Sequence, residues 1–272
     1  MSTESQWADG PASRPFFLVG ALRSGTTLLR LLLGHHPRIC RCEEFEFVAS
    51  AIAGKAQWPD LAAYREELPY RLDVRLSGIA PIPESRDFPD LAHQLLLRLA
   101  RADGSKLVGA TVHHHFDELP RLWLQARFIY LERDPRDVAR SCVQQGWAGN
   151  AWSAVPIWQA ARTTWLRLRA TLPSERYIEV KYERLVDDAE PVLSRITGFL
   201  GLEYDPAMLD IEADSTYQRP DPGLATSWRT ESNEKEIREM ESRLGPDLED
   251  AGYPPSGLPR LGLGSLDELR LR

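Results

Sequence analysis

A turn between two glycines near the start of the chain constrains the fold more than any other feature. Residues 20–27 read Gly20-Ala21-Leu22-Arg23-Ser24-Gly25-Thr26-Thr27, between an apolar run of strand type and a leucine-rich run of helix type. This spacing of two glycines and a following hydroxyl residue is that of a nucleotide-phosphate loop. A strand that turns through glycines into a helix directs backbone N–H groups and the positive end of the helix dipole at an anion. The turn therefore predicts an α/β fold with an anion site where the first strand ends.

The loop departs from ATP-binding loops at one position. Their lysine contacts the β- and γ-phosphates, and Thr26 stands in its place here. Arg23 supplies the cation instead, while Ser24, Thr26 and Thr27 supply hydroxyl donors that suit phosphate or sulfate. We therefore expect a nucleotide with an anionic 5′ group and no γ-phosphate to bind. The alternative is a glycine turn with a purely structural role.

Composition and charge exclude several classes of protein. The 272 residues, of which 43% are hydrophobic and 27% charged, suit one globular domain with a sizeable core. A net charge of −7 argues against non-specific binding to nucleic acid or to an anionic membrane. The polar start lacks a signal peptide, and charged residues interrupt the most apolar stretch, 16–33. We therefore expect a cytoplasmic protein with no membrane span.

The sequence offers little for a metal ion. Its three cysteines, Cys40, Cys42 and Cys142, fit neither a disulfide framework nor the spacing of a zinc site. Three consecutive histidines at 113–115 have no carboxylate or cysteine at ligand spacing beside them. We therefore expect no metal, and a histidine-bound metal is the minor alternative.

Apolar runs and helical patterns alternate along the chain. Strand-type runs occupy 15–20, 38–42, 106–112, 127–132 and 177–180, and helical segments occupy 28–34, 89–102, 117–123, 135–145, 155–171, 188–200 and 231–244. Strands separated by such helices pair in parallel, so we expect a P-loop-like, doubly wound, mostly parallel sheet with helices on both faces. We expect a single domain at 15–255, between a disordered lead at 1–14 and a loose tail at 256–272. A long loop is expected at 212–230.

A second group of polar residues follows the strand predicted at 127–132. Arg133 comes at its end, and Ser141 follows about two helical turns later. Because ligands of such sheets bind beyond the carboxyl ends of the strands, we expect both residues to lie near the first loop, together with Tyr182. Arg133 could then hold a phosphate with two parallel hydrogen bonds while Ser141 donates its hydroxyl. The alternative is an arginine paired with Asp134 or Asp137 and a serine that faces solvent.

Taken together, these motifs resemble those of the sulfotransferases that use 3′-phosphoadenosine 5′-phosphosulfate (PAPS). The similarity rests on residues 23–27 and 128–141, with a third match over 180–202, and it spans 15–255. It implies that the first motif binds the 5′-phosphosulfate and that the arginine and serine of the second hold the 3′-phosphate. The cofactor-binding residues that the resemblance implies are Arg23, Ser24, Gly25, Thr26, Thr27, Arg133, Ser141, Tyr182, Trp228 and Arg229.

One acidic residue is the candidate general base. Within the family, the stretch 36–44 is most similar to the protein-tyrosine sulfotransferases, where the second glutamate of an equivalent pair is the base. That residue is Glu44 here. We expect it to be buried among Phe45 and Phe47, because an apolar setting makes a carboxylate a better base for an acceptor hydroxyl. The alternative is a solvated acidic turn.

The chain lacks a cation that many relatives carry. Their lysine near the third strand end is implied to stabilise the transferred group, and Ala110 stands in its place. One histidine, His113 or His114, is the candidate for the missing cation or for the base. We take His113 as the second catalytic candidate, with a structural loop as the alternative.

The expected function is transfer of a sulfuryl group from PAPS to a hydroxyl, or less often an amine, of a small molecule, a glycan or a peptide. An ATP-dependent small-molecule kinase and a non-catalytic nucleotide-binding protein are the alternatives. The sequence does not identify the acceptor or the oligomeric state. Trp147, Trp152, Trp158 and Trp165 are candidates for an acceptor cleft, with a place in the core as their alternative.

Overall fold

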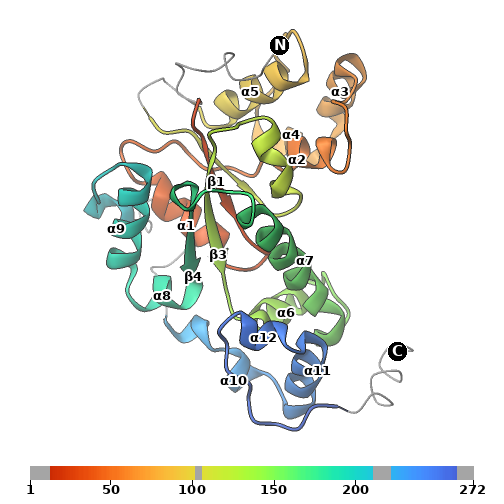
Figure 1. The fold of residues 1–272 in the computed structure, drawn as a ribbon, viewed down its shortest axis with the longest axis vertical. Coiled ribbons are helices and arrows are strands. Elements are labelled where there is room, and N and C mark those ends of the chain that lie inside the picture. The colour runs from red at the N-terminus through yellow and green to blue at the C-terminus, as the bar shows by residue number, and fades with distance from the viewer. Residues whose placement is uncertain (1–12, 102–105, 211–221, 262–272) are drawn as a thin grey trace.

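Four parallel strands form the central sheet of the computed structural model, which describes residues 13–101, 106–210 and 222–261. The strands are β1 (Phe16–Val19), β2 (Gly109–Val112), β3 (Arg127–Glu132) and β4 (Tyr177–Lys181), in the order β2-β1-β3-β4. From β1 the chain passes to β2 on one side, and it then crosses β1 to reach β3 on the other (Figure 1). The carboxyl ends of β1 and β3 therefore meet at a switch point, where sheets of this kind bind their ligands.

α-helices and shorter 3₁₀ turns together account for most of the remaining described chain. They are α1 (Thr26–Gly34), α2 (Glu46–Ile52), α3 (Leu61–Glu67), α4 (Leu72–Ser77), α5 (Phe88–Leu99), α6 (Pro135–Gln144), α7 (Ala151–Arg169), α8 (Tyr182–Asp187), α9 (Ala189–Leu200), α10 (Trp228–Glu231), α11 (Glu234–Leu244) and α12 (Asp247–Asp250). Shorter 3₁₀ turns are η2 (Leu68–Tyr70), η3 (Phe116–Arg121), η4 (Ser174–Arg176), η5 (Pro206–Leu209) and η7 (Pro222–Ala225). Within the described ranges, each helix is too short or too polar to reach across a lipid bilayer.

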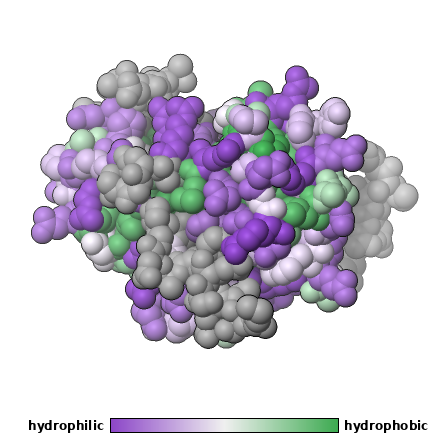
Figure 2. Space-filling view, turned by 90° about the horizontal axis from the view of Figure 1, so that it is seen from above, coloured by the Kyte–Doolittle hydropathy of each residue, from purple (hydrophilic) through white to green (hydrophobic). Residues whose placement is uncertain are grey.

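Alternate residues of β1 belong to different cores. Phe17 and Val19 pack with residues of α2, α5 and η3, whereas Phe16 and Leu18 pack with residues of α1, α8 and α9. All four side chains are fully buried, as the two-residue period of a strand requires when helices cover both faces. The expected α/β architecture, with helices on both faces of a parallel sheet, is therefore confirmed (Figure 1). Seen from above in Figure 2, the outer surface is mostly hydrophilic, with small separate hydrophobic patches.

A third core lies beyond the carboxyl end of β3 and positions α6. Val138 of α6, Trp158 of α7 and Met240 of α11 share this buried cluster. Asp134 caps α6 through its side chain, and Pro135 occupies the first helical position, where its missing N–H costs nothing. These features begin the helix directly after Arg133, as the sequence predicts.

The run expected to form a strand at 38–42 is not a strand of the sheet. Instead, Ile39 and Glu44 each form an isolated parallel bridge, to Leu107 and Thr111. Because only its two ends pair in this way, the segment 39–44 runs along the outer edge of β2 without becoming a strand of the sheet. This edge places the residues after Cys42 next to the carboxyl end of β2.

The described part of the expected loose tail, residues 256–261, makes hydrogen bonds to α11. The Ser256 hydroxyl donates to Glu241 of α11 at 2.9 Å, and the Leu261 amide donates to the Ser242 hydroxyl at 2.8 Å. The proline-rich composition suggests a loose tail, whereas these contacts depend on how the segment packs against α11. Residues 1–12 of the expected lead, 211–221 of the expected long loop and 262–272 of the expected tail lie outside the described residues. The rest of that loop contains η7 and α10.

We expect Gly109→Ala to destabilise the protein by about 1–3 kcal/mol, because overpacking a filled core forces its neighbours to shift. A Cβ at this β2 position would lie 2.3 Å from the buried Phe16 ring of β1. Urea unfolding followed by circular dichroism measures the effect. Gly198→Ala in α9 is the matched control, since a Cβ there meets nothing within 4 Å. Equal unfolding midpoints for the two variants would contradict the close packing of β1 and β2.

Candidate active site

The turn after β1 can adopt its path only with glycine at its two ends. A Cβ at Gly20 would lie 2.4 Å from the carbonyl oxygen of Leu131 in β3, so no larger residue fits between the strands. Gly25 has a φ of 93°, and Arg23 has a φ of 68°, a left-handed conformation that is uncommon outside glycine. α1 then begins at Thr26. The first-turn N–H groups of α1 therefore lie at the switch point between β1 and β3.

Two motifs that are 118 residues apart in the sequence meet through the side chain of Arg23. Its Nε donates to the hydroxyl of Ser141 at 2.9 Å. Arg133 completes the junction, because its Nη1 donates to the backbone carbonyl of Arg23 at 3.2 Å. The turn after β1, the end of β3 and helix α6 therefore lie together, so the structure brings Arg23, Arg133 and Ser141 to one place.

Tyr182, which follows β4, closes the other side of the turn. Its ring lies so close to Gly25 that a Cβ on that glycine would be 2.3 Å from the ring. The guanidinium of Arg133 lies over the same ring, 4.4 Å from its centre, in a cation–π arrangement. Tyr182 is buried. Gly25 is thus required both for its backbone conformation and for the ring that packs on it.

The hydroxyl of Ser24 is suited to a ligand oxygen. Ser24 is fully buried, and its Oγ meets no hydrogen-bond partner among the described residues. Buried polar atoms in native proteins almost always have a partner. An orphaned donor inside a turn of this shape therefore fits an anion such as phosphate or sulfate. Thr26, also buried, and Thr27 follow in the first turn of α1.

Glu44 lies beside the end of β2, but it is not buried as expected. The Phe45 amide donates to the Thr111 carbonyl at 2.9 Å, so this segment follows the edge of β2. Phe45 and Phe47 are fully buried, whereas Glu44 is exposed. Its neighbour Glu43 pairs with Arg30 at 2.8 Å. Of this glutamate pair, Glu44 is therefore the one open to a ligand, and the expectation of an apolar setting for it is wrong.

The two candidate histidines have different surroundings. His113 is buried, and its Nδ1 lies 3.0 Å from the carbonyl oxygen of Gly20. A carbonyl only accepts, so Nδ1 carries the proton, and Nε2 is the acceptor of the neutral ring. His114 is half-exposed and lies 3.5 Å from Glu46, whose hydrogen bond raises the pKa of that imidazole. Of the two candidates, His113 is thus the one next to the turn. Ala110, where relatives carry lysine, is fully buried.

Trp228 and Arg229 lie near α6, and in the part of the chain that the structure describes they contact residues other than those of the turn. The Asp137 carboxylate accepts from the Trp228 amide at 2.8 Å, and Arg136 lies over the Trp228 ring at 3.6 Å. Arg229 is exposed and stacks on the same ring at 4.3 Å. Burial raises the pKa of Asp137. Sequence reasoning missed the buried charges of this region, although the charged run at 133–137 in the first turn of a helix was a signal for them.

Of the four tryptophans proposed for an acceptor cleft, one is available. Trp152, Trp158 and Trp165 are buried, whereas Trp147 is 51% exposed. The guanidinium of Arg23 lies over the Trp147 ring at 5.6 Å. An exposed aromatic face therefore adjoins the turn. The described residues hold no group of three His, Cys, Asp or Glu placed to bind a metal.

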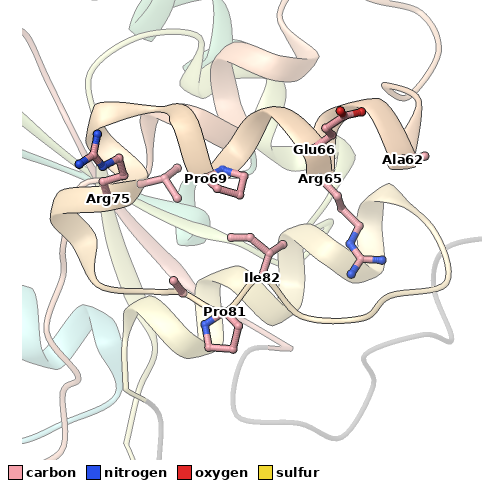
Figure 3. Close-up of a pocket in the computed structure, with 9 residues that line it drawn as sticks. Ala62, Arg65, Glu66, Pro69, Arg75, Pro81 and Ile82 are labelled. Carbon is pink, nitrogen blue, oxygen red and sulfur yellow. The ribbon is translucent and has the colours of Figure 1, made fainter.

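A half-open cavity of about 630 Å³ lies elsewhere, between α3, η2, α4 and the segment 80–82 (Figure 3). Its walls are mostly apolar, from residues such as Pro69, Val74 and Ile82. None of the expected site residues lines it. In Figure 1, α3 and α4 lie at the opposite end of the molecule from α6 and α10. The cavity is therefore separate from the site around Arg23.

Comparisons with known proteins agree with this geometry. The chain is 28% identical over 227 residues to an uncharacterised protein of Aquifex aeolicus, of which it spans only 27%. It is 25% identical to a putative protein-tyrosine sulfotransferase of Caenorhabditis briggsae, covering 88% of this chain and 89% of that one.

Two solved structures share the fold. A sulfotransferase domain from the curacin biosynthetic pathway has a TM-score of 0.60 at 18% identity and covers 89% of this chain and 98% of its own. A mouse sulfotransferase complexed with PAP has a TM-score of 0.53 at 15% identity and covers 88% and 87%. The model of the sulfotransferase family matches residues 15–206, well over half of the 272 residues. The chain therefore belongs to the sulfotransferase family.

Proposed function

We propose that this sulfotransferase moves a sulfuryl group from PAPS to a hydroxyl, or less often an amine, of a small molecule, glycan or peptide. The observation that carries the proposal is the junction of Arg133, Arg23 and Ser141. It joins the two motifs that are implied to hold the 5′ and 3′ ends of one nucleotide. The mouse structure complexed with PAP, which has the same fold, supports the same donor.

Different residues of the site bind the two ends of the nucleotide. The first-turn amides of α1, the buried Ser24 hydroxyl and the hydroxyls of Thr26 and Thr27 suit the phosphosulfate. Arg133 and Ser141, which meet at the turn through Arg23, suit the 3′-phosphate.

Catalysis then consists mainly of positioning and charge stabilisation. PAPS, when bound, supplies the sulfuryl group and leaves as PAP, the same nucleotide without that group. Glu44 takes the proton of the acceptor hydroxyl. At the same time the hydroxyl oxygen of the acceptor bonds to sulfur, and the bond from sulfur to the 5′-phosphate oxygen breaks. Arg23 balances the charge that develops on the departing phosphate. His113, fixed by Gly20, is a second group that can hold a proton at Nε2.

The aromatic face of Trp147 is the structural feature most relevant to the acceptor. It is exposed and adjoins Arg23, so an acceptor that approaches the turn can pack on it. Aromatic rings bind the flat faces of other rings through dispersion and offset stacking. A ring-bearing acceptor, such as a phenol or a sugar, therefore suits this site better than a linear one.

Calorimetric titration with PAP, AMP and ATP tests the donor. We expect PAP to bind most tightly, and Arg133→Ala to weaken PAP binding by ~10–150-fold, because a charged hydrogen bond contributes more than a neutral one. Ser141→Ala should weaken it by ~2–10-fold. Arg127→Ala, at the opposite end of β3, is the control and should leave PAP binding unchanged. Equal affinities for PAP and AMP would rule out the 3′-phosphate assignment, and preferential binding of ATP would favour a kinase.

A screen with labelled PAPS against phenols, sugars, lipids and peptides tests catalysis. With an accepted substrate, we expect Glu44→Gln to lower turnover by ~10²–10⁴-fold, the usual contribution of general base catalysis. PAP affinity should not change. Glu43→Gln is the matched control, because Glu43 is already paired with Arg30. Normal turnover of the Glu44 variant would remove this residue as the base and direct attention to His113.

A further inference from the structure

The helix that carries Ser141 begins in a buried ionic cluster that the proposed reaction does not use. We call it the brace, and it consists of Asp134, Arg136, Glu183, Glu241 and Tyr253. Its members come from the first turn of α6, from α8, from α11 and from the segment after α12. Asp134 and Arg136, which follow Arg133 within three residues, connect the parts of the brace through Glu183 and Glu241.

Arg136 is the centre of the brace. Its guanidinium donates to both carboxylate oxygens of Asp134, at 3.0 and 2.7 Å, and to Glu241 at 2.6 Å. Only 1% of Arg136 and 2% of Glu241 are exposed to solvent. The Trp228 ring covers one face of the guanidinium at 3.6 Å. The orientation of the arginine is therefore fixed on three sides.

A second set of contacts in the brace holds the backbone at the start of α6. The Asp134 amide donates to Glu183 at 2.8 Å, and the Tyr253 hydroxyl donates to the other oxygen of Glu183 at 3.2 Å. Burial raises the pKa of both Glu183 and Tyr253. Asp134 is thus held through its side chain by Arg136 and through its backbone by Glu183.

The far end of the brace is the segment after α12. Glu241 accepts from the Ser256 amide at 2.8 Å and from the Ser256 hydroxyl at 2.9 Å. Arg136 also donates to the Pro254 carbonyl at 3.1 Å. The family match ends at residue 206, so Glu241 and the residues after it lie outside the matched segment. The last part of the described chain therefore closes on the start of α6.

Buried ion pairs of this kind add little stability over apolar residues of the same size, because desolvation offsets the attraction. A forked guanidinium with several acceptors does, however, fix direction, since each N–H must point at its partner. The residue just before this fixed turn is Arg133, whose contacts with the Arg23 carbonyl and the Tyr182 ring depend on where the backbone turns. The cluster is therefore better suited to orientation than to stability.

We propose that Glu241 is a positioning residue that, through Arg136 and Asp134, holds Arg133 in the geometry that selects a 3′-phosphate. The inference rests on the proposed function, in which Arg133 binds that phosphate. It assigns the segment from α11 to Ser256 a role in nucleotide specificity. The turn at 20–25 is held by β1 and α1 and by the packing of Gly20 on β3 as well as by Arg133, so binding of the 5′ end depends less on the brace.

The test measures PAP and AMP affinities of Glu241→Gln and Ser256→Ala by calorimetry at a temperature where both variants are folded. We expect Glu241→Gln to weaken PAP binding by ~10-fold or more, a change of the size that outer partners produce at metal sites, because Arg136 loses a charged partner and then holds Asp134 less firmly. AMP binding should stay within about twofold. Ser256→Ala removes the hydroxyl contacts with Glu241 and with the Leu258 amide but keeps the Ser256 amide contact with Glu241. It should therefore shift PAP binding in the same direction by a smaller factor. In turnover, the KM for PAPS should rise while kcat is retained.

Lys235→Met is the matched control. It removes the ion pair between Lys235 and Glu239, which are 3.8 Å apart in α11 and lie outside the brace. A lower melting temperature with an unchanged ratio of PAP to AMP affinity in Glu241→Gln would overturn the inference and leave the proposed function standing. Wild-type protein that binds PAP and AMP equally would overturn both. If Glu241→Gln does not fold, an unchanged ratio in Ser256→Ala is the overturning result.

Discussion

The close approach of two parallel strand ends is the constraint on which the rest of the site depends. Position 20, at the end of β1, has no room for a side chain, because a Cβ there would lie 2.4 Å from the Leu131 carbonyl oxygen of β3. That contact brings the end of β3 beside the turn, so Arg133 reaches the Arg23 carbonyl and Arg23 reaches Ser141. The order of strands in the sheet makes β1 and β3 neighbours. Sheet topology, rather than any local motif, thus assembles the site.

The parts predicted from sequence are those that short-range patterns determine. Local sequence predicts the strands β1, β3 and β4 from their apolar runs, and it predicts the first turn from its glycines. A parallel sheet then brings the carboxyl ends of its strands together. Arg133 was placed correctly because it follows a strong strand and precedes a capped helix. The start of α7 at Ala151 rather than 155 was missed, since the side chain of Asn150 caps it through Ser153.

What the sequence did not reveal depends on contacts between distant residues. The exposure of Glu44 follows from the way its segment pairs along β2, which buries Phe45 and Phe47 instead. Arg136 and Glu241 are 105 residues apart, and no local pattern pairs them. The contacts of Ser256 were missed for the same reason: composition describes a segment, whereas burial depends on what packs against it.

The arginines of the site have different electrostatic roles because their partners differ. Arg136 is enclosed by two carboxylates, so its charge is balanced within the protein. Within the described ranges, the Arg23 guanidinium contacts the Ser141 hydroxyl and the Trp147 ring, both neutral, so its positive charge remains for a ligand. A protein with a net charge of −7 can bind a polyanionic nucleotide only if it concentrates positive charge locally. By binding the carboxylates of Asp134 and Glu241, Arg136 also limits the negative field they exert on Arg133. The brace therefore influences the site through charge as well as through geometry.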